Sequence, residues 1–272
     1  MSLVSNASVV APPRARLAGV VPVVLVCAGA LAGCGQAGAT PNENAVAEAP
    51  AGRGSAQGSA QDPPANRLTP EEEADGWKLL FDGSLDGWRG YRRDDVPAGW
   101  QSRDGALMFM PGNRGGTIIT VDQFADFELA LEWKVSEGGN SGVFYRATED
   151  EIRPYWTGPE MQVLDNAGHR DGATPETSAG SNYALHAPSE DVTRPVGEWN
   201  RARIIVRGAQ VEHWMNGVRI VAYELWTDEW RALVQRSKFG EWPGYGMASA
   251  GHIGLQDHGD PVWFRNIKIR TF

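Results

Sequence analysis

An apolar side chain occupies every odd position of residues 127–135, whereas the even positions hold Glu, Ala, Glu and Lys. Successive side chains of a β strand point to opposite faces, so this run predicts a strand with one buried and one polar face. Farther along, Asn216-Gly217 separates two further apolar runs. Both residues of such a turn tolerate a positive φ, which makes this pair a strong signal for a tight hairpin. Together these features predict antiparallel strands packed on a core.

Short runs of the same kind recur through the body of the chain. Strands are predicted at residues 77–81, 106–110, 117–121, 127–135, 142–146, 160–164, 183–186, 199–206, 210–215, 218–223, 252–256 and 262–270. Only residues 227–236 have a plausible helical composition. About a dozen short strands separated by Gly-containing turns predict an all-β, two-sheet sandwich rather than alternating strands and helices.

The first 33 residues have the character of an export signal. Arg14 and Arg16 precede fifteen uncharged residues, 17–31, a stretch too short to cross a hydrocarbon core of about 30 Å as a helix. The sequence Leu-Ala-Gly-Cys that ends at Cys34 resembles the lipobox of bacterial lipoproteins. Gly35, rather than Asp, follows the cysteine, which favours the outer membrane over the inner one. We therefore expect an exported lipoprotein on the periplasmic or cell-surface side of the envelope, with Cys34 lipidated.

Residues 34–75 are rich in Gly, Ala, Ser, Gln, Pro and Asn, which predicts a flexible linker between the lipid and the domain of residues 76–272. Removal of residues 1–33 takes away two arginines and no acids, so the net charge of −9 becomes −9 − 2 = −11. Such an acidic chain lacks the positive surface that nucleic-acid binding requires. Cleavage also removes Cys27, so the exported domain has no pair of cysteines for a disulfide.

The sharpest cluster of polar residues lies in Glu160-Met161-Gln162-Val163-Leu164-Asp165. On a strand, Glu160 and Gln162 share one face, while Met161, Val163 and Asp165 share the other. This arrangement suits a strand that floors a polar cleft; the alternative is an exposed strand with solvated side chains. Retaining glycosidases place two carboxyl groups about 5–5.5 Å apart. The nearest neighbour of Glu160 on its face is an amide, which gives poor support for a paired-carboxylate reaction.

Eight strings in register resemble the 3-keto-disaccharide hydrolase domain family, and together they span residues 76–272. They are LFDGSLDGW (80–88), GGNSGVFYR (138–146), PEMQVLD (159–165), GEWN (197–200), WMNG (214–217), SKFGEWP (237–243), GHIGLQDHG (251–259) and VWFRNIKI (262–269). The resemblance implies a jelly roll of the concanavalin A-like lectin and glucanase type, with a sugar cleft on its concave sheet. It also implies cleavage of 3-keto-glycosides in at least some members.

A 3-keto sugar can be cleaved without two carboxylates, because the C3 carbonyl acidifies the proton at C2. One base can remove that proton while the glycosidic oxygen leaves C1, and water then adds to the enone. The reaction needs a base, a group that stabilises the enolate and a proton donor. We assign Glu160 as the base and Arg146, Lys238 or His258 to the other two roles.

Several further residues are predicted to contact a sugar. Trp156 and Trp242 lie in loops beside Pro and Gly, where an aromatic ring can stack on the C–H face of a sugar. We expect most of the 11 tryptophans to be structural instead. Polar contacts are predicted for Asn140, Gln162, Tyr183, Lys238 and Gln256. Asp257 is expected to face away from the cleft because it alternates with Gln256 and His258.

Two other functions remain open at this point. The domain could be a carbohydrate-binding module without catalysis, or a glycosidase that uses water and two acids. No cofactor is predicted, because the five histidines show no zinc-type spacing and no phosphate or dinucleotide motif occurs. The pair Asp165-Asn166 leaves Ca²⁺ or another divalent metal open.

Overall fold

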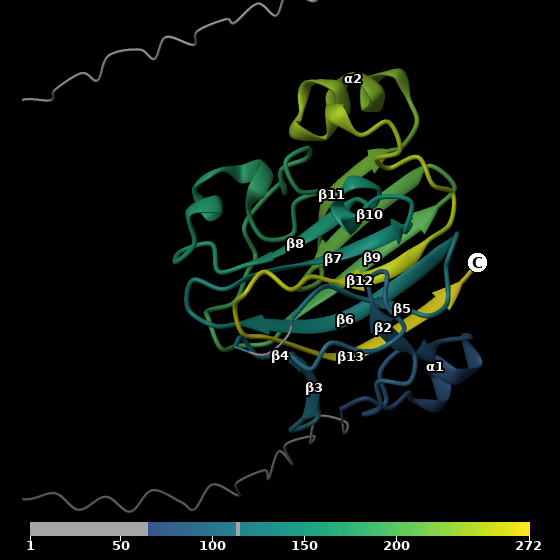
Figure 1. Cartoon of the computed structure of the whole chain (residues 1–272), viewed down its shortest axis with the longest axis vertical. Coiled ribbons are helices and arrows are strands. Elements are labelled where there is room, and N and C mark those ends of the chain that lie inside the picture. The colour runs from purple at the N-terminus through teal and green to yellow at the C-terminus, as the bar shows by residue number, and fades with distance from the viewer. Residues whose placement is uncertain (1–64, 113–114) are drawn as a thin grey trace, which may run out of the picture. The chain divides into compact units, whose positions relative to one another are not determined.

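A computed structural model describes residues 65–112 and 115–272, which form two antiparallel sheets (Figure 1). The larger, eight-stranded sheet has the order β11-β10-β9-β6-β13-β4-β3, and β1 also pairs with β13. Its strands are β1 (Lys78–Leu79), β3 (Trp100–Arg103), β4 (Ala106–Phe109), β6 (Phe127–Val135), β9 (Asn200–Arg207), β10 (Gln210–Met215), β11 (Val218–Glu224) and β13 (Val262–Thr271).

The smaller sheet has five strands in the order β2-β5-β12-β7-β8. They are β2 (Trp88–Gly90), β5 (Ile118–Thr120), β7 (Asn140–Ala147), β8 (Glu160–Leu164) and β12 (His252–Leu255). The helices are α1 (Pro70–Ala74) and α2 (Asp228–Arg236), with 3₁₀ turns η1 (Pro154–Trp156), η2 (Arg170–Ala173), η3 (Pro175–Thr177) and η4 (Lys238–Glu241). Neither α-helix of the described part is long and apolar enough to span a membrane.

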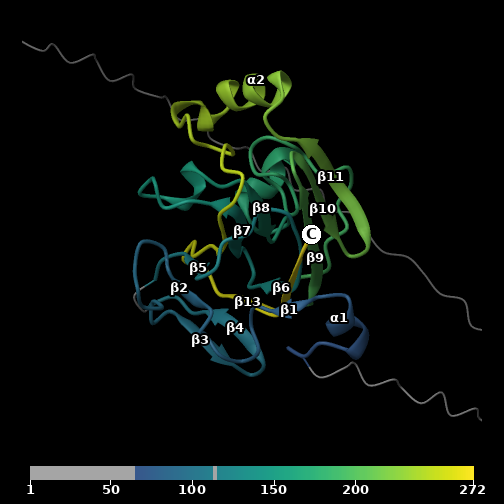
Figure 2. The same ribbon diagram turned by 90° about the vertical axis from the view of Figure 1, so that its right-hand side faces the viewer.

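The apolar faces of the two sheets pack against each other, and Figure 2 shows the sheets as two layers. The alternation in β6 predicted this arrangement: Leu129, Leu131 and Trp133 are at most 4% exposed and join Val143 and Met161 of the smaller sheet in one core. The predicted class, an all-β two-sheet sandwich, is therefore confirmed. Four tryptophans, Trp88, Trp100, Trp133 and Trp230, are buried, and the other seven are partly exposed.

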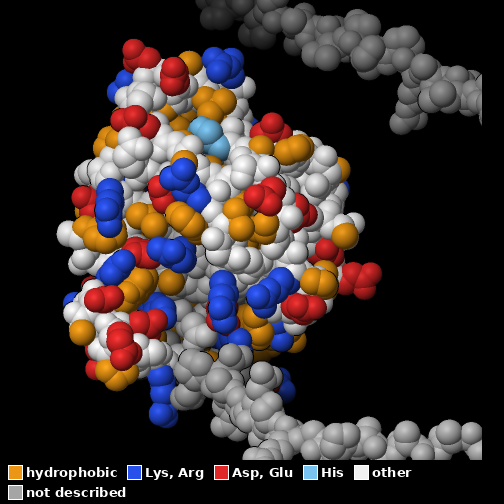
Figure 3. Space-filling model, turned by 180° about the vertical axis from the view of Figure 1, so that it is seen from behind, with side chains coloured by type: hydrophobic (Ala, Val, Ile, Leu, Met, Phe, Trp, Pro, Cys, Tyr) orange, Lys and Arg blue, Asp and Glu red, His pale blue; other side chains and the backbone are white. Residues whose placement is uncertain are grey.

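The outer face of the eight-stranded sheet is polar and carries several ion pairs. Glu128 is bonded to both Arg203 and Arg270, and Glu132 is paired with Arg265. Figure 3, seen from behind, shows basic, acidic and apolar side chains interspersed over this face. The sheet thus buries one face and solvates the other, as the alternating sequence requires.

The structure differs from the predicted secondary structure at three points. Residues 183–186 form a turn rather than a strand, because Ala184 has φ +60° and the amides of Leu185 and His186 both bond to the carbonyl of Asn182. The short strands β2 and β3 were not predicted. Part of the predicted linker is folded, since α1 begins with a capping box between Thr69 and Glu72.

The segment before α1 is also tied to the domain. The backbone amides of Asn66 and Asn266 each donate to the side-chain Oδ1 of the other residue, and Lys268 donates to Glu72. The folded region therefore includes residues 66–75, which precede the predicted boundary at residue 76. The rest of the predicted linker and the predicted signal lie outside the described residues.

The predicted hairpin is present between β10 and β11, where Asn216 and Gly217 have φ values of +50° and +91°. Gly217→Ala should lower the free energy of unfolding by about 1–2 kcal/mol, because a Cβ is disfavoured in left-handed backbone. Gly244→Ala is the matched control, since no atom lies within 4 Å of its added Cβ. Urea unfolding of both variants measures the difference; equal losses would contradict a specific requirement of this turn.

Candidate active site

A cleft of about 710 Å³ lies on the face of the five-stranded sheet that points away from the core. Met161 and Val163 of β8 belong to the core, so alternation directs Glu160 and Gln162 to the opposite face. The lining residues are Gly115, Gly116, Thr117, Asn140, Arg153, Pro154, Tyr155, Glu160, Gln162, Tyr183, Lys238, Gln256, Asp257 and His258. The structure thus brings together seven of the residues predicted from the sequence, which are Asn140, Glu160, Gln162, Tyr183, Lys238, Gln256 and His258.

Glu160 is the central acid of this cleft. Its side chain is only 4% exposed, and its Oε1 has no hydrogen-bond partner among the described residues. Burial raises the pKa of Glu160 to about 8, because an ionised carboxylate loses its hydration there, while the positive charge of Lys238 acts in the opposite direction. An acid of this kind can take up or release a proton near neutral pH.

The neighbouring strand leaves room for this carboxyl group. Gly142 of β7 pairs with Gln162 of β8, and a Cβ at Gly142 would lie 1.8 Å from Oε1 of Glu160. A side chain at this position would displace the Glu160 carboxyl group, so the glycine leaves the space that this group occupies. The floor continues with Gln162, whose Nε2 donates to Oδ1 of Asn140 over 3.4 Å and whose Oε1 has no partner in the described structure. The floor of the cleft thus contains two buried side-chain oxygens without a hydrogen-bond partner in the described structure.

Lys238 forms the positively charged part of the wall. It belongs to η4, and its Nζ lies 4.1 Å from the centre of the Tyr183 ring. Burial lowers the pKa of Lys238, while the charges of Glu160 and Asp171 raise it. The Tyr183 hydroxyl donates to Oδ2 of Asp171 over 3.0 Å, which fixes the ring beneath the ammonium group. No ion pair joins Lys238 and Glu160 in the described structure, although both line the cleft.

The opposite wall follows β12 and contains Gln256, Asp257 and His258. The expectation that Asp257 faces away is wrong, because β12 ends at Leu255 and strict alternation ends with it. Asp257 instead accepts bonds from the amides of Gly116 (2.6 Å) and Gly259 (2.8 Å). His258 is exposed, and its Nδ1 lies 3.9 Å from a carboxylate oxygen of Asp260.

Arg146 lies elsewhere, contrary to the prediction that it joins Glu160. It has φ +48°, and the pairing of β7 with β12 shifts register at this point, which indicates a bulge. A bulge re-aims the side chain. The guanidinium donates to the carbonyls of Ala125 and Gly208 and pairs with Asp126, all outside the cleft lining. Arg146 is therefore a structural residue that ties loops together.

The two tryptophans that were predicted to stack on a sugar stack on each other instead. Trp156 and Trp242 are stacked with ring centres 4.9 Å apart and an angle of 14° between their planes. Neither belongs to the cleft lining. The stack joins η1 to the segment after η4, so it holds in place two loops that supply lining residues, Tyr155 and Lys238.

Sequence reasoning missed the residues that reach the cleft from loops, which are Gly115, Gly116, Thr117, Arg153, Pro154, Tyr155 and Asp257. The only local signal was the Pro-Tyr pair beside Trp156. For metals, no cluster of three or more His, Cys, Asp or Glu side chains in the described part is arranged to hold an ion. The oxygens of Asp165 accept from the amides of Gly138 and Ala167, which gives this side chain a structural role.

The fold and the cleft define a β-sandwich protein with a buried acid on the outer face of one sheet. Residues 76–270 match the sequence family described as the 3-keto-alpha-glucoside-1,2-lyase-like domain. A protein of Bacteroides thetaiotaomicron named 3-keto-disaccharide hydrolase is 40% identical over 230 residues, which cover 73% of this chain and 79% of the relative.

Solved structures give the same result. One described as a putative glycosyl hydrolase from Parabacteroides distasonis is 32% identical, with a TM-score of 0.72 over 76% of this chain and 99% of its own. A second from that organism, with the same description, is 28% identical, with a TM-score of 0.57 over 72% of this chain and 99% of its own. The chain belongs to the 3-keto-alpha-glucoside-1,2-lyase-like domain family, and the prediction that it is an enzyme is confirmed.

The raised pKa of Glu160 predicts a pH-dependent stability. Between pH 4.5 and 8 the folded protein retains a proton that the unfolded chain has released, so stability falls as pH rises. In the variant Glu160→Gln this loss is absent. The difference in free energy of unfolding between this variant and the wild type should therefore shift in favour of the variant by about 1.4 kcal/mol for each pH unit across this window.

Urea unfolding at pH 5, 6, 7 and 8 measures the effect. Glu176→Gln is the control, since Glu176 is exposed and solvated in both states. Parallel pH curves for the wild type and Glu160→Gln would show that the buried acid is not the cause.

Proposed function

We propose that this enzyme cleaves 3-keto-glycosides by elimination followed by hydration. The observation that carries the proposal is a single buried acid, Glu160, with an amide rather than a second carboxyl group beside it on the sheet and a lysine in the same cleft. The name of the relative from Bacteroides thetaiotaomicron supports 3-keto-disaccharides as the substrate class.

In the first half of the reaction, the ionised carboxylate of Glu160 removes the proton from C2 of the keto sugar. The electron pair of the C–H bond forms an enolate with the C3 carbonyl, and the enolate then expels the glycosidic oxygen from C1. That oxygen takes a proton, which leaves an alcohol and a 1,2-ene-3-one. In the second half, water adds to C1 and C2 regains a proton, so the net change is hydrolysis.

The residues of the cleft divide these tasks by charge and position. Lys238 supplies positive charge for the enolate oxygen, because it is a partly desolvated ammonium group in the wall. His258, exposed at the rim, donates the proton to the leaving oxygen. Asn140, Gln162, Tyr183 and Gln256 contact the sugar hydroxyls. Arg146 has no role in this scheme because its side chain lies outside the cleft.

A hydrolysis with two acids is the second candidate, and Asp257 favours it. This residue places another carboxylate in the cleft, which the alternation of the sequence did not predict. Two bonds from backbone amides hold its side chain in place. The two mechanisms differ at C2, because only the elimination exchanges the proton there.

The decisive measurement follows turnover of a 3-keto-glucoside and its unoxidised parent in D₂O. We expect cleavage of the keto sugar only, with deuterium at C2 of the product. Glu160→Gln should lower kcat/KM by about 10²–10⁴-fold, the usual contribution of a general base. For the wild type, kcat/KM should rise with pH toward about 8, as the carboxyl group of Glu160 ionises.

Asp257→Asn is the matched amide control for this experiment. Under elimination it should retain far more activity than Glu160→Gln, whereas hydrolysis with two acids requires similar losses in both. Cleavage without deuterium at C2 would overturn the elimination, and full turnover by Glu160→Gln would remove Glu160 as the base.

We further propose that residues 1–33 are removed and that lipid on Cys34 anchors the enzyme to the envelope, on its periplasmic or surface side. The support is the order of basic residues, apolar stretch and cysteine in the sequence. In a bacterium with two membranes, an alkyne fatty acid should label the wild type and Cys27→Ser but not Cys34→Ser. Labelled Cys34→Ser protein would refute the anchor.

A further inference from the structure

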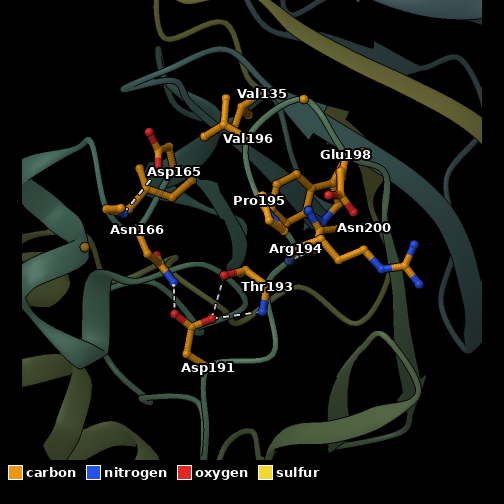
Figure 4. A pocket seen from close by; sticks show the side chains of 15 residues that line it. Val135, Asp165, Asn166, Asp191, Thr193, Arg194, Pro195, Val196, Glu198 and Asn200 are labelled. Atoms are coloured by element: carbon orange, nitrogen blue, oxygen red, sulfur yellow. Dashed lines mark hydrogen bonds between the residues drawn. The ribbon is translucent and has the colours of Figure 1, made fainter. Parts of the chain in front are cut away.

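A second cavity, of about 570 Å³, lies at the end of β6 and β8 and shares no lining residue with the cleft. Figure 4 shows it from close by. Its wall combines the ends of these strands, the start of β9 and the loop that precedes β9. The lining residues are Trp133, Val135, Leu164, Asp165, Asn166, Ala167, Gly172, Asp191, Thr193, Arg194, Pro195, Val196, Gly197, Glu198 and Asn200.

The walls of this cavity are held by hydrogen bonds within the protein. Oδ2 of Asp191 accepts from Asn166 over 3.0 Å, and Oδ1 accepts from the amide and hydroxyl of Thr193 (Figure 4). The amide of Arg194 donates to Oδ1 of Asn200 over 2.8 Å. The loop is thus fixed at both ends, and the cavity exists before any ligand arrives.

One buried donor in the wall is unsatisfied. Trp133 is 1% exposed, and its indole Nε1 has no hydrogen-bond partner among the described residues. A buried donor without an acceptor is destabilising, so such groups in native proteins are nearly always paired. Trp133 also lines the cavity, where a hydroxyl or carbonyl oxygen of a ligand would supply the missing acceptor.

The charges of the lining define the class of ligand. The lining contains three carboxylates, Asp165, Asp191 and Glu198, and one guanidinium, Arg194. This excess of negative charge disfavours binding of an anion. Asp165 and Asp191 accept hydrogen bonds from amides and side chains. The side chain of Glu198 is exposed and has no hydrogen-bond or ion-pair partner in the described structure, so it is available to a ligand. Pro195 and Val196 supply apolar surface beside it, and Val196 is 44% exposed.

We propose that this cavity is a second binding site for a neutral sugar, separate from the reacting cleft. Sugar sites combine apolar surface for the C–H face of the ring with a few fixed polar groups, and their volumes fall within about 300–1,000 Å³. Here the indole N–H of Trp133 donates to a ring substituent, the carboxylate of Glu198 accepts from hydroxyls, and Pro195 and Val196 pack against carbon. The site does not depend on the proposed reaction.

The loop between β8 and η3 connects the two sites. Asn166, Ala167 and Gly172 line the second cavity, whereas Asp171 of the same loop holds the Tyr183 hydroxyl in the cleft. A sugar in the second cavity therefore rests on the segment that also positions Tyr183. This placement suits a glycan that is retained beside the cleft while its end is processed.

The test uses ¹H–¹⁵N spectra of the indole groups, in which the Trp133 signal is the one that Trp133→Phe lacks. Methyl α-D-glucopyranoside, methyl β-D-glucopyranoside and methyl β-D-galactopyranoside are titrated, with glucuronate as the anionic comparison. We expect at least one neutral glycoside to shift the Trp133 signal to saturation, and glucuronate to bind at least 3-fold more weakly. Glu198→Gln should weaken binding of the neutral sugar by about 3- to 10-fold, the size of one ordinary hydrogen bond.

Two further variants separate the cavity from the cleft and from the rest of the surface. Val196→Trp should block the cavity and abolish the shift, while Val121→Trp, at another exposed valine, should not. Glu160→Gln should leave the shift intact, which distinguishes this site from the reacting one. If Trp133→Phe does not fold, backbone-linked assignment identifies the signal in the wild type. An unmoved Trp133 signal with all three glycosides, or equal binding of glucuronate, would overturn the proposal.

Discussion

The alternation of side chains along β8 is the constraint on which both halves of this structure depend. Met161 and Val163 must point inward, because the sandwich core is closed by their contacts with the larger sheet. Glu160 and Gln162 are consequently forced to the opposite face, where they form the floor of the cleft. A shift of register by one residue would exchange these two sets, placing an acid in the core and apolar groups in the cleft. The packing of the sandwich therefore fixes the geometry of the site.

This dependence explains how much the sequence could predict. Period and turn chemistry are local, so the sandwich, the Asn216-Gly217 hairpin and the bounds of β6, β8 and β10 could be derived from them. The cleft residues Glu160 and Gln162 follow from the same rule, whereas Asn140 lies before the strand predicted at residues 142–146. Cleft residues from loops do not, because Tyr155 and Asp257 are positioned by contacts distant in sequence, such as the bond from the Gly116 amide.

Two errors have a more specific cause. Arg146 was expected in the cleft, but its strand has a bulge at this point, marked by a positive φ, and nothing in the sequence predicted the bulge. Trp156 and Trp242 lie in loops, as sugar-stacking rings do, but each ring stacks its apolar face on the other. Composition identifies such rings, whereas their partners are set by the relative position of two loops.

The buried state of Glu160 links stability to the proposed chemistry. A carboxyl group beside a lysine would form an ion pair if both were free to approach, and its pKa would then fall. Here no such pair exists in the described structure, and desolvation raises the pKa of Glu160 to about 8. A base without an ion-pair partner is suited to removing a weakly acidic proton from carbon, and its conjugate acid, after exchange with solvent, can deliver a proton to C2 when water has added. In the proposed reaction the keto sugar occupies the cleft that Glu160 and Lys238 both line, so the base and the positive charge for the enolate oxygen act on one substrate without first pairing with each other.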